Sequence, residues 1–394
     1  MVSVKPPSQR RKSPLRAAQN PLDRPLEISY TALGTVGEER PFEMSLGANA
    51  FTELCRKELE LCGVHEGEVV AVLSQGDERL DYCDAFLAAA THLGATSFHV
   101  RLPTESPTLS GDVGSWTVGA TPLAGNRPAV EAIKSADILI DTMFLLFSKE
   151  QLEIQAAGTR IVLCIEPIEH LAQLFPTREL RERVEYGEQL LGNARSLRFT
   201  NSLGTDCTYK LGDYGVIAEY GYSDIPGRWD HWPSGFLFTG GADDGVDGKV
   251  VLAPGDIIFP FKSYVQTPVE ITIEQGRIVD IRGQLDADLV SEYMRSFHDE
   301  KAYGIAHIGW GLNQNARWSF LATDRRGLGM HGRSFYGNVL FSTGPNQEFG
   351  GTNDTQCHVD IPMRNCSLFL DDEPIVRDGD IVVPEMQAPG LVRA

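Results

Sequence analysis

The stretch EVVAVLSQGDERLDYCDAFLAAATHLGATSFHVR, residues 68–101, decides the fold class. Its apolar run Glu68–Ser74 predicts a short buried strand, and the apolar spacing within Arg79–Leu93, closed by Gly94, predicts an amphipathic helix. Thr96–Arg101 then returns to an extended pattern. A strand, a helix and a second strand in this order are typical of a βαβ unit, whose two strands run parallel. The sequence therefore predicts α/β architecture in this region.

The same alternation continues on both sides of this stretch. Apolar residues at helical spacing lie within residues 51–62, Asp137–Asp141 and Arg160–Ile165 have the composition of buried strands, and Arg178–Leu191 predicts a charged amphipathic helix. We therefore expect residues 45–200 to form a doubly wound α/β domain with a largely parallel sheet. No GxGxxG motif opens a helix after any of these strands, so nothing here indicates a dinucleotide cofactor.

The pattern changes after about residue 200 to short extended runs separated by glycine and proline. A hairpin is expected over Ile271–Gly283 and one helix over Leu285–Phe297. We predict that residues 201–394 form a β-rich α+β domain that holds the catalytic metal site. Residues 1–44 are expected to be a basic, proline-rich arm and lead-in, or alternatively a weak organelle-targeting segment, because the arm is rich in arginine and poor in acidic residues.

Charge and cysteine content restrict the function classes. The chain has 35 Lys and Arg against 54 Asp and Glu, a net charge of −19, which disfavours binding to nucleic acid and to anionic membranes. Its apolar runs are far shorter than the roughly 18 residues that a membrane span needs. Seven cysteines without CxxC spacing predict reduced core residues in a cytoplasmic protein.

Two histidines and an aspartate are candidate metal ligands. His358 and Asp360 are two residues apart in an apolar run, so on a strand both side chains point to the same face. His307 lies in a second apolar, strand-like stretch of the same domain. Two imidazoles and one carboxylate suit a non-haem iron(II) site. The alternative is that these histidines are buried core residues with satisfied hydrogen bonds, which is common in apolar strands.

The segment Arg325–Gly332 contains three glycines and lies outside any expected strand or long helix. Glycine permits the backbone changes that a lid needs, so we interpret the segment as a mobile flap beside the site, with Arg333 placed to hold an anionic oxygen of a ligand. An ordinary surface loop is the alternative. The chain contains no GxSxG, HExxH or P-loop motif, so the commonest hydrolase and NTPase signatures are absent.

Three segments carry a resemblance to the thermophilic aminopeptidase T family. They are Phe199–Asp206, the Trp232–Gly235 turn and His358–Asp360, and the resemblance covers roughly residues 45–385. Those peptidases hold two metals and place a glutamate where this chain has Phe236 and another where it has His307. They also have a histidine in the part aligned with residues 335–340, where this chain has none. The resemblance therefore implies the fold but not the two-metal site.

The remaining set of His307, His358 and Asp360 resembles the iron site of the 2,5-dihydroxypyridine 5,6-dioxygenase family. This resemblance implies Fe(II) as the cofactor, and a small N-heteroaromatic ring and O2 as the substrates. It also implies that both oxygen atoms enter the product, so that 2,5-dihydroxypyridine is opened to N-formylmaleamate. The relatives associate into homo-oligomers, and we expect the same here. A zinc or cobalt aminopeptidase and a non-catalytic relative are the alternatives.

The resemblance implies four further site residues. His231, with a pKa near neutrality, is expected to take a proton from the ring hydroxyl or return one later, and Glu219 is expected to orient it. Arg333 and Ser342 are expected to fix the ring. Members of the family also place a histidine in a loop where this chain reads Met143–Phe147. Either His231 carries proton transfer alone, or the substrate has a different pattern of ring substituents.

Overall fold

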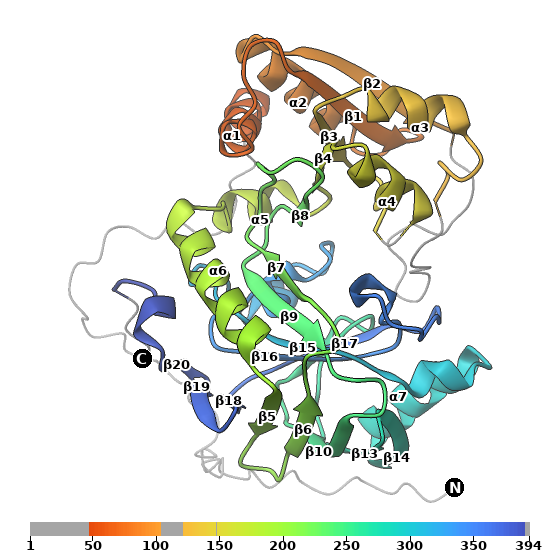
Figure 1. The fold of residues 1–394 in the computed structure, drawn as a ribbon, viewed down its shortest axis with the longest axis vertical. Coiled ribbons are helices and arrows are strands. Elements are labelled where there is room, and N and C mark those ends of the chain that lie inside the picture. Colours follow the sequence, from red (N-terminus) through yellow and green to blue (C-terminus); the bar gives the residue numbers. More distant parts are fainter. Residues whose placement is uncertain (1–46, 104–120, 147, 391–394) are drawn as a thin grey trace, which may run out of the picture. The chain divides into compact units, whose positions relative to one another are not determined.

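The computed structural model describes residues 47–103, 121–146 and 148–390. The predicted N-terminal arm and Phe147 lie outside the described residues. All described residues belong to one compact unit. Four sheets make up its described part: a parallel sheet of five strands, an antiparallel sheet of eight, an antiparallel sheet of five and a two-stranded ribbon (Figure 1). The expected mixed α/β fold class is therefore confirmed.

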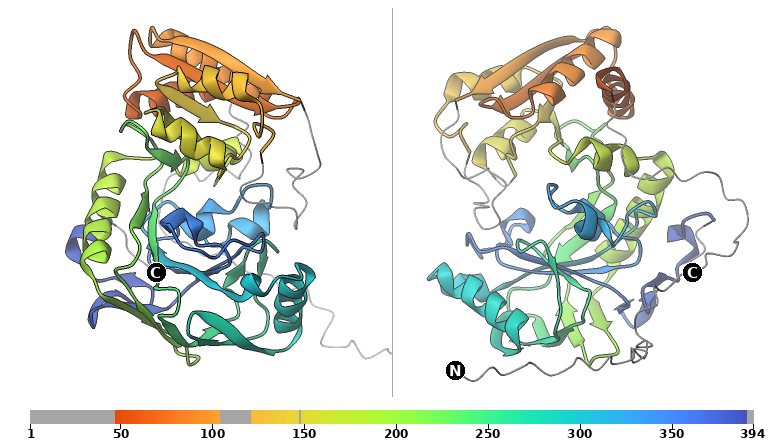
Figure 2. Two further views of the ribbon diagram at one scale, coloured as in Figure 1. Left: turned by 45° about the vertical axis from the view of Figure 1, so that its right-hand side comes forward. Right: turned by 180° about the vertical axis from the view of Figure 1, so that it is seen from behind.

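The parallel sheet has five strands, in the order β2 (Thr96–Leu102), β1 (Val69–Gln75), β3 (Ile138–Asp141), β4 (Arg160–Leu163) and β8 (Trp229–His231). Alternate residues of its strands enter two separate cores. One core joins the sheet to α1 (Ala48–Leu61) and α2 (Leu80–His92), and the other joins it to α3 (Arg127–Lys134) and α4 (Lys149–Ala156). Helices thus cover both faces, as expected of a doubly wound layer (Figure 2).

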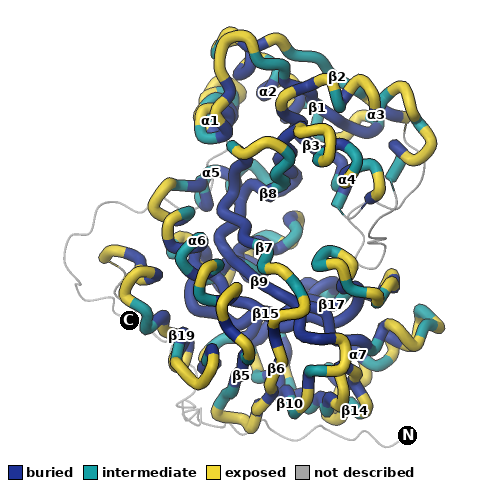
Figure 3. The backbone as a smooth tube through the Cα atoms, in the orientation of Figure 1, coloured by how far each residue is buried: buried dark blue, intermediate teal, exposed yellow. Residues whose placement is uncertain are grey.

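Two antiparallel sheets form most of the second half. The larger contains eight strands, in the order β14 (Arg277–Gly283), β13 (Val269–Glu274), β10 (Val246–Leu252), β6 (Asp206–Lys210), β5 (Ser196–Thr200), β18 (Ser367–Leu370), β19 (Glu373–Arg377) and β20 (Asp380–Ile381). The smaller contains five strands, in the order β17 (Val359–Met363), β16 (Val339–Thr343), β15 (Ile305–Gly311), β9 (Phe236–Gly240) and β7 (Val216–Glu219). Strands β9, β15 and β17 are buried along their whole length (Figure 3).

Short elements complete the described part of the chain. They are the ribbon strands β11 (Ile257–Ile258) and β12 (Ser263–Tyr264), the helices α5 (Ile168–Gln173), α6 (Arg178–Asn193), α7 (Leu285–Ser296), α8 (Phe320–Thr323) and α9 (Met330–Arg333), and the 3-10 turns Glu300–Tyr303, Gln347–Phe349 and Pro384–Met386. No described helix is long and apolar enough to span a bilayer. All seven cysteines are buried and unpaired, as their apolar settings predicted.

The chain crosses between the sheets near the expected domain boundary at residue 200. Strand β5 comes before that boundary but pairs within the eight-stranded sheet, and β8 comes after it but completes the parallel sheet next to β4. Because β8 ends at His231, this crossing carries a predicted site residue to the carboxyl edge of the parallel sheet. Ligands bind at that edge in open α/β sheets. The division at residue 200 stays a prediction.

Candidate metal centre and its cavity

His307 lies in an irregular part of β15. Ile305 pairs with Thr343 of β16 and Ile308 pairs with Phe341, so three steps along β15 face two steps along β16. This extra residue is a β-bulge, which bends a strand and redirects the side chains within it. At this bulge His307 lies beside Asp360 of β17 and beside His358, the residue just before that strand.

The three candidate ligands meet at one carboxylate oxygen. Nε2 of His307 lies 3.1 Å from Oδ1 of Asp360, and Nε2 of His358 lies 3.0 Å from the same oxygen. One donor atom from each residue lies within 4.8 Å of the other two. His307 and Asp360 are each 5% exposed. Two imidazoles and one carboxylate with converging donor atoms, of which only His358 is partly exposed, fit a divalent transition-metal ion.

The ionisation states also suit a metal site. Burial lowers the pKa of His307, so its imidazole is neutral, which is the form that coordinates a metal. Burial opposes ionisation of Asp360, but His358 and Arg333 outweigh it and hold the pKa of that carboxyl well below its usual range. The site therefore presents a neutral imidazole and an anionic oxygen.

Arg333 binds the second oxygen of Asp360. Its Nε and Nη2 lie 2.8 and 2.7 Å from Oδ2, and its guanidinium lies over the ring of Phe259 at 4.2 Å. Asp360 thus uses Oδ1 toward the two histidines and Oδ2 toward the arginine. The sequence predicted Arg333 as a ligand-binding residue, and the structure also gives it the task of orienting a candidate metal ligand.

A cavity of about 440 Å³ opens onto this centre. Its lining combines residues from the parallel-sheet half, such as Phe144, Leu146 and Trp229, with residues of the smaller antiparallel sheet. Six of the seven predicted site residues line it, namely Glu219, His231, His307, Arg333, His358 and Asp360. Ser342 pairs with Asp360 in the sheet register and its hydroxyl is buried, but it is not among the lining residues.

Glu219, on β7, is a buried acid that accepts a hydrogen bond from Oγ of Ser234 at 3.0 Å. Burial, reinforced by Asp230, raises the pKa of Glu219 to about 8. A carboxyl with this pKa is mostly protonated at neutral pH, so Glu219 can donate a hydrogen bond into the cavity. The side chain that donates to Glu219 is thus Ser234 and not His231, which Glu219 was expected to orient.

His231 is 4% exposed, and among the described residues its Nε2 has no hydrogen-bond partner. Burial lowers the pKa of His231 to about 4, although the nearby carboxylate of Glu166 opposes this shift. The sequence suggested a pKa near neutrality. The difference arises because the end of β8 is enclosed, which the sequence does not reveal. A neutral imidazole with a free nitrogen can accept a proton.

Further ionisable side chains that were not predicted line the cavity, among them Lys262 and Glu348. Lys262 is 5% exposed and donates from Nζ to the carbonyl oxygen of Arg325 at 3.1 Å, and burial lowers its pKa. Burial also raises the pKa of Glu348 well above its usual value, with Asp360 and Glu219 adding to the effect. Lys262 lies in the turn between β11 and β12, and Glu348 lies in a three-residue 3-10 turn. In such short connections neither spacing nor periodicity marks a functional side chain.

The loop after β3, where the resemblance led us to look for a histidine, supplies an apolar wall. Asp141 accepts hydrogen bonds from the backbone amides of Met143, Phe144 and Leu145, which fixes the loop after β3. Phe144 has a φ of 78° and lines the cavity together with Leu146. Phe236 also lines the cavity and stacks on Phe238, with ring centroids 5.2 Å apart.

Comparison with known proteins identifies the family. Residues 50–383 match the NicX family model, described as 2,5-dihydroxypyridine 5,6-dioxygenase. The chain is 45% identical over 337 residues to a 2,5-dihydroxypyridine 5,6-dioxygenase of Pseudomonas putida, which covers 85% of this chain and 96% of the relative.

Solved structures extend the comparison. A 2,5-dihydroxypyridine dioxygenase structure from Pseudomonas putida matches with a TM-score of 0.84 and 44% identity, covering 86% of this chain and 99% of the other. AmpT from Thermus thermophilus matches with a TM-score of 0.55 and 14% identity over 84% of this chain and all of the other, a likeness of fold. The family match and the close relative together establish that this chain belongs to the 2,5-dihydroxypyridine 5,6-dioxygenase family.

Proposed function

We propose that the chain is an iron(II)-dependent, extradiol-like dioxygenase that opens the ring of a hydroxylated pyridine, with 2,5-dihydroxypyridine as the substrate and N-formylmaleamate as the product. The observation that carries the proposal is the meeting of His307, His358 and Asp360 at the cavity wall, with donor atoms within 4.8 Å of one another. Membership of the family supports the ring-opening reaction and the substrate class.

The three residues fit iron(II) by their chemistry. Two imidazoles and one carboxylate form the 2-His-1-carboxylate set that non-haem iron oxygenases use. Bound iron(II) supplies the one-electron steps that dioxygen, a triplet molecule, needs to react with a closed-shell ring. Arg333 contributes by holding Oδ2 of Asp360, so that Oδ1 stays directed to the histidines.

His231 is the proposed proton acceptor. Its imidazole is neutral, its Nε2 is buried without a partner in the described structure, and it lines the cavity. It can take the proton of a ring hydroxyl at Nε2 and return that proton to the opened product. Since residues 143–146 carry no titratable side chain, His231 performs this transfer without the loop histidine of other family members.

Glu219 and Arg333 position the ring. Protonated Glu219 donates a hydrogen bond to an acceptor atom of the ring or its substituents, while Arg333 attracts the ionised ring oxygen. Ser342, also proposed as a ring contact, has a buried Oγ with no partner among the described residues. We further infer a cytoplasmic homo-oligomer: unpaired buried thiols suit a reducing compartment, and association is what the family resemblance implies.

The test is oxygen consumption by protein purified without air and supplied with ferrous ion. We expect one O2 consumed for each 2,5-dihydroxypyridine opened, activity that falls on chelation and returns with iron(II), and no comparable return with zinc. Hydrolysis of amino-acid amides without oxygen would instead place the chain with the peptidases. Ring loss without oxygen uptake would contradict the proposal.

A further inference from the structure

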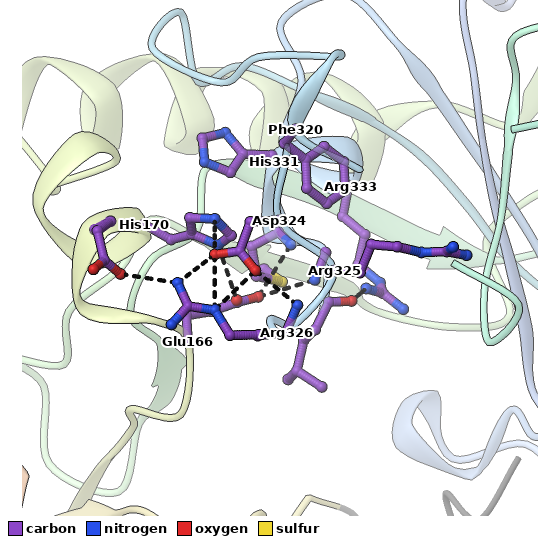
Figure 4. Close-up of polar contacts among 12 residues, drawn as sticks. Glu166, His170, Phe320, Asp324, Arg325, Arg326, His331 and Arg333 are labelled. Carbon is purple, nitrogen blue, oxygen red and sulfur yellow. Dashed lines mark hydrogen bonds and ion pairs between the residues drawn. The ribbon is translucent and has the colours of Figure 1, made fainter. Parts of the chain in front are cut away.

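A buried carboxylate on the parallel-sheet side holds the segment that carries Arg333. Glu166 follows β4 by three residues and is fully buried. Its Oε1 accepts hydrogen bonds from the backbone amides of Gly329 and Met330 at 3.0 and 3.2 Å. Figure 4 shows the polar contacts around Glu166, including those of His170, Asp324 and Arg326. These two amides begin the one-turn helix that ends at Arg333. We call this set of contacts the Glu166 clamp.

Glycines allow the backbone of the clamped segment to lie close to Glu166 and Phe259. A Cβ atom at Gly327 would overlap Oε2 of Glu166, and a Cβ at Gly329 would overlap the ring of Phe259, on which Arg333 lies. Gly329 also has a φ of 98°, which disfavours other residues. The glycines predicted to make this segment a flap therefore serve here to bring its backbone against a buried acid.

The other oxygen of Glu166 is held as well. Nδ1 of His170 lies 3.4 Å from Oε2, and Nε2 of His170 lies 3.5 Å from Oδ2 of Asp324, which pairs with Arg326. Burial opposes ionisation of Glu166, but His170, His231 and the amide of Met330 outweigh it and lower its pKa. The acid is thus an ionised acceptor that faces the flap from inside the fold.

The one-turn helix that starts at the clamp ends at Arg333, which contacts the candidate metal ligand Asp360. Arg333 donates from Nη1 to the carbonyl oxygen of Leu328, within the clamped segment, and from Nε and Nη2 to Asp360. Asn338 fixes the same turn from the opposite side through the carbonyl oxygens of Gly332 and Arg333 at 2.7 and 3.0 Å. A shift at Gly329 and Met330 therefore moves the guanidinium that orients Asp360.

We propose that Glu166 is a positioning residue of this enzyme: by clamping the amides of Gly329 and Met330, it sets Arg333 against Asp360 and the substrate. This inference rests on the proposed function for its effect on catalysis. The clamp itself is a property of the fold and can be measured separately.

The test compares Glu166→Gln with Glu169→Gln, its matched control. Glu169 lies on the same segment and contacts Arg326 at 3.4 Å, so the control removes the same charge from the same side of the flap but leaves both clamped amides alone. We expect Glu166→Gln to raise KM for 2,5-dihydroxypyridine about tenfold, with a smaller change in kcat and unchanged iron content. The control should change neither constant.

A double-mutant cycle separates positioning from general destabilisation. If Glu166 acts through Arg333, Glu166→Gln should add little to the KM of Arg333→Lys, since the guanidinium that it places is already gone. Additive effects on KM would overturn the proposal. Should Glu166→Gln fail to fold, Gly327→Ala pushes the flap off the clamp with Glu166 intact, and it should give the same rise in KM.

Hydrogen exchange measures the clamp without turnover. The amides of residues 329–333 should exchange faster in Glu166→Gln than in wild type, and at the wild-type rate in Glu169→Gln. Unchanged exchange together with unchanged KM would overturn the inference. Faster exchange in a protein that opens no pyridine ring would uphold the clamp and overturn the proposed function, so the two failures are distinguishable.

Discussion

Arg333 and the two histidines use different oxygens of Asp360. The guanidinium of Arg333 lies 2.7 and 2.8 Å from Oδ2, whereas His307 and His358 approach Oδ1. A bound metal between the histidines would therefore meet a carboxylate whose second oxygen is already occupied. The arginine orients Asp360 and balances its charge. Residues that hold a metal ligand in this way affect the affinity of the site for the metal.

Replacing Asp360 should remove the metal. In Asp360→Asn the side chain keeps its shape but loses its charge, and the partly buried guanidinium of Arg333 loses its counterion. We expect iron content after anaerobic purification to fall at least about tenfold, and oxygen uptake to fall with it. Asp354→Asn, an exposed change six residues earlier, is the control and should keep both. Full iron and full turnover in Asp360→Asn would remove this residue from the ligand set.

Glu219 should make stability depend on pH. Its pKa is raised from 4.5 to about 8 in the folded state, so between these values the folded protein holds a proton that the unfolded chain has released. The free energy of unfolding should therefore fall as pH rises from about 4.5 to 8, by up to about 1.4 kcal/mol per pH unit from this group. Below the lower value both states are protonated and the contribution is constant.

The Glu219→Gln variant isolates this contribution. Glutamine cannot titrate, so the difference in unfolding free energy between wild type and variant should shrink or reverse across that interval, measured by urea titration of metal-free protein at several pH values. A difference that stays constant from pH 5 to 8 would show that Glu219 is ionised in the folded protein and cannot be the hydrogen-bond donor proposed.

The sequence was informative where periodicity and residue chemistry decide the outcome. The strand and helix patterns of residues 68–101 predicted β1, α2 and β2, and the i, i+2 spacing of His358 and Asp360 predicted that both face one site. These features depend on local geometry alone. They do not depend on which distant segments of the chain pack against them.

Features that depend on distant contacts could not be predicted in the same way. The low pKa of His231 follows from enclosure at the end of β8, a strand of three residues that joins a sheet formed earlier in the chain. Glu166 and Lys262 stand in sequence contexts without a motif, and their roles depend on which loop folds against them. The bulge at His307 is likewise a property of the pairing between two strands.

Gly309 tests the packing of the strand that carries His307. A Cβ atom there would overlap the backbone of Leu237 and Phe238 on the neighbouring strand β9. We expect Gly309→Ala to lower the free energy of unfolding by about 1–3 kcal/mol, because β15 and β9 must separate to admit the methyl group. Thermal unfolding measures this change. Gly215→Ala, where the added atom meets open space, should leave the melting temperature nearly unchanged.

The His231→Ala variant tests the proposed proton transfer and not the fold. In His231→Ala the ring opening should slow by about 10²–10⁴-fold, since a positioned proton acceptor is lost, while iron content stays at the wild-type level. Added imidazole should restore part of the rate by entering the vacated space. Because the pKa of His231 is about 4, wild-type activity should not fall through protonation of this residue until the pH approaches that value. Loss of iron in the variant would instead assign His231 to the metal.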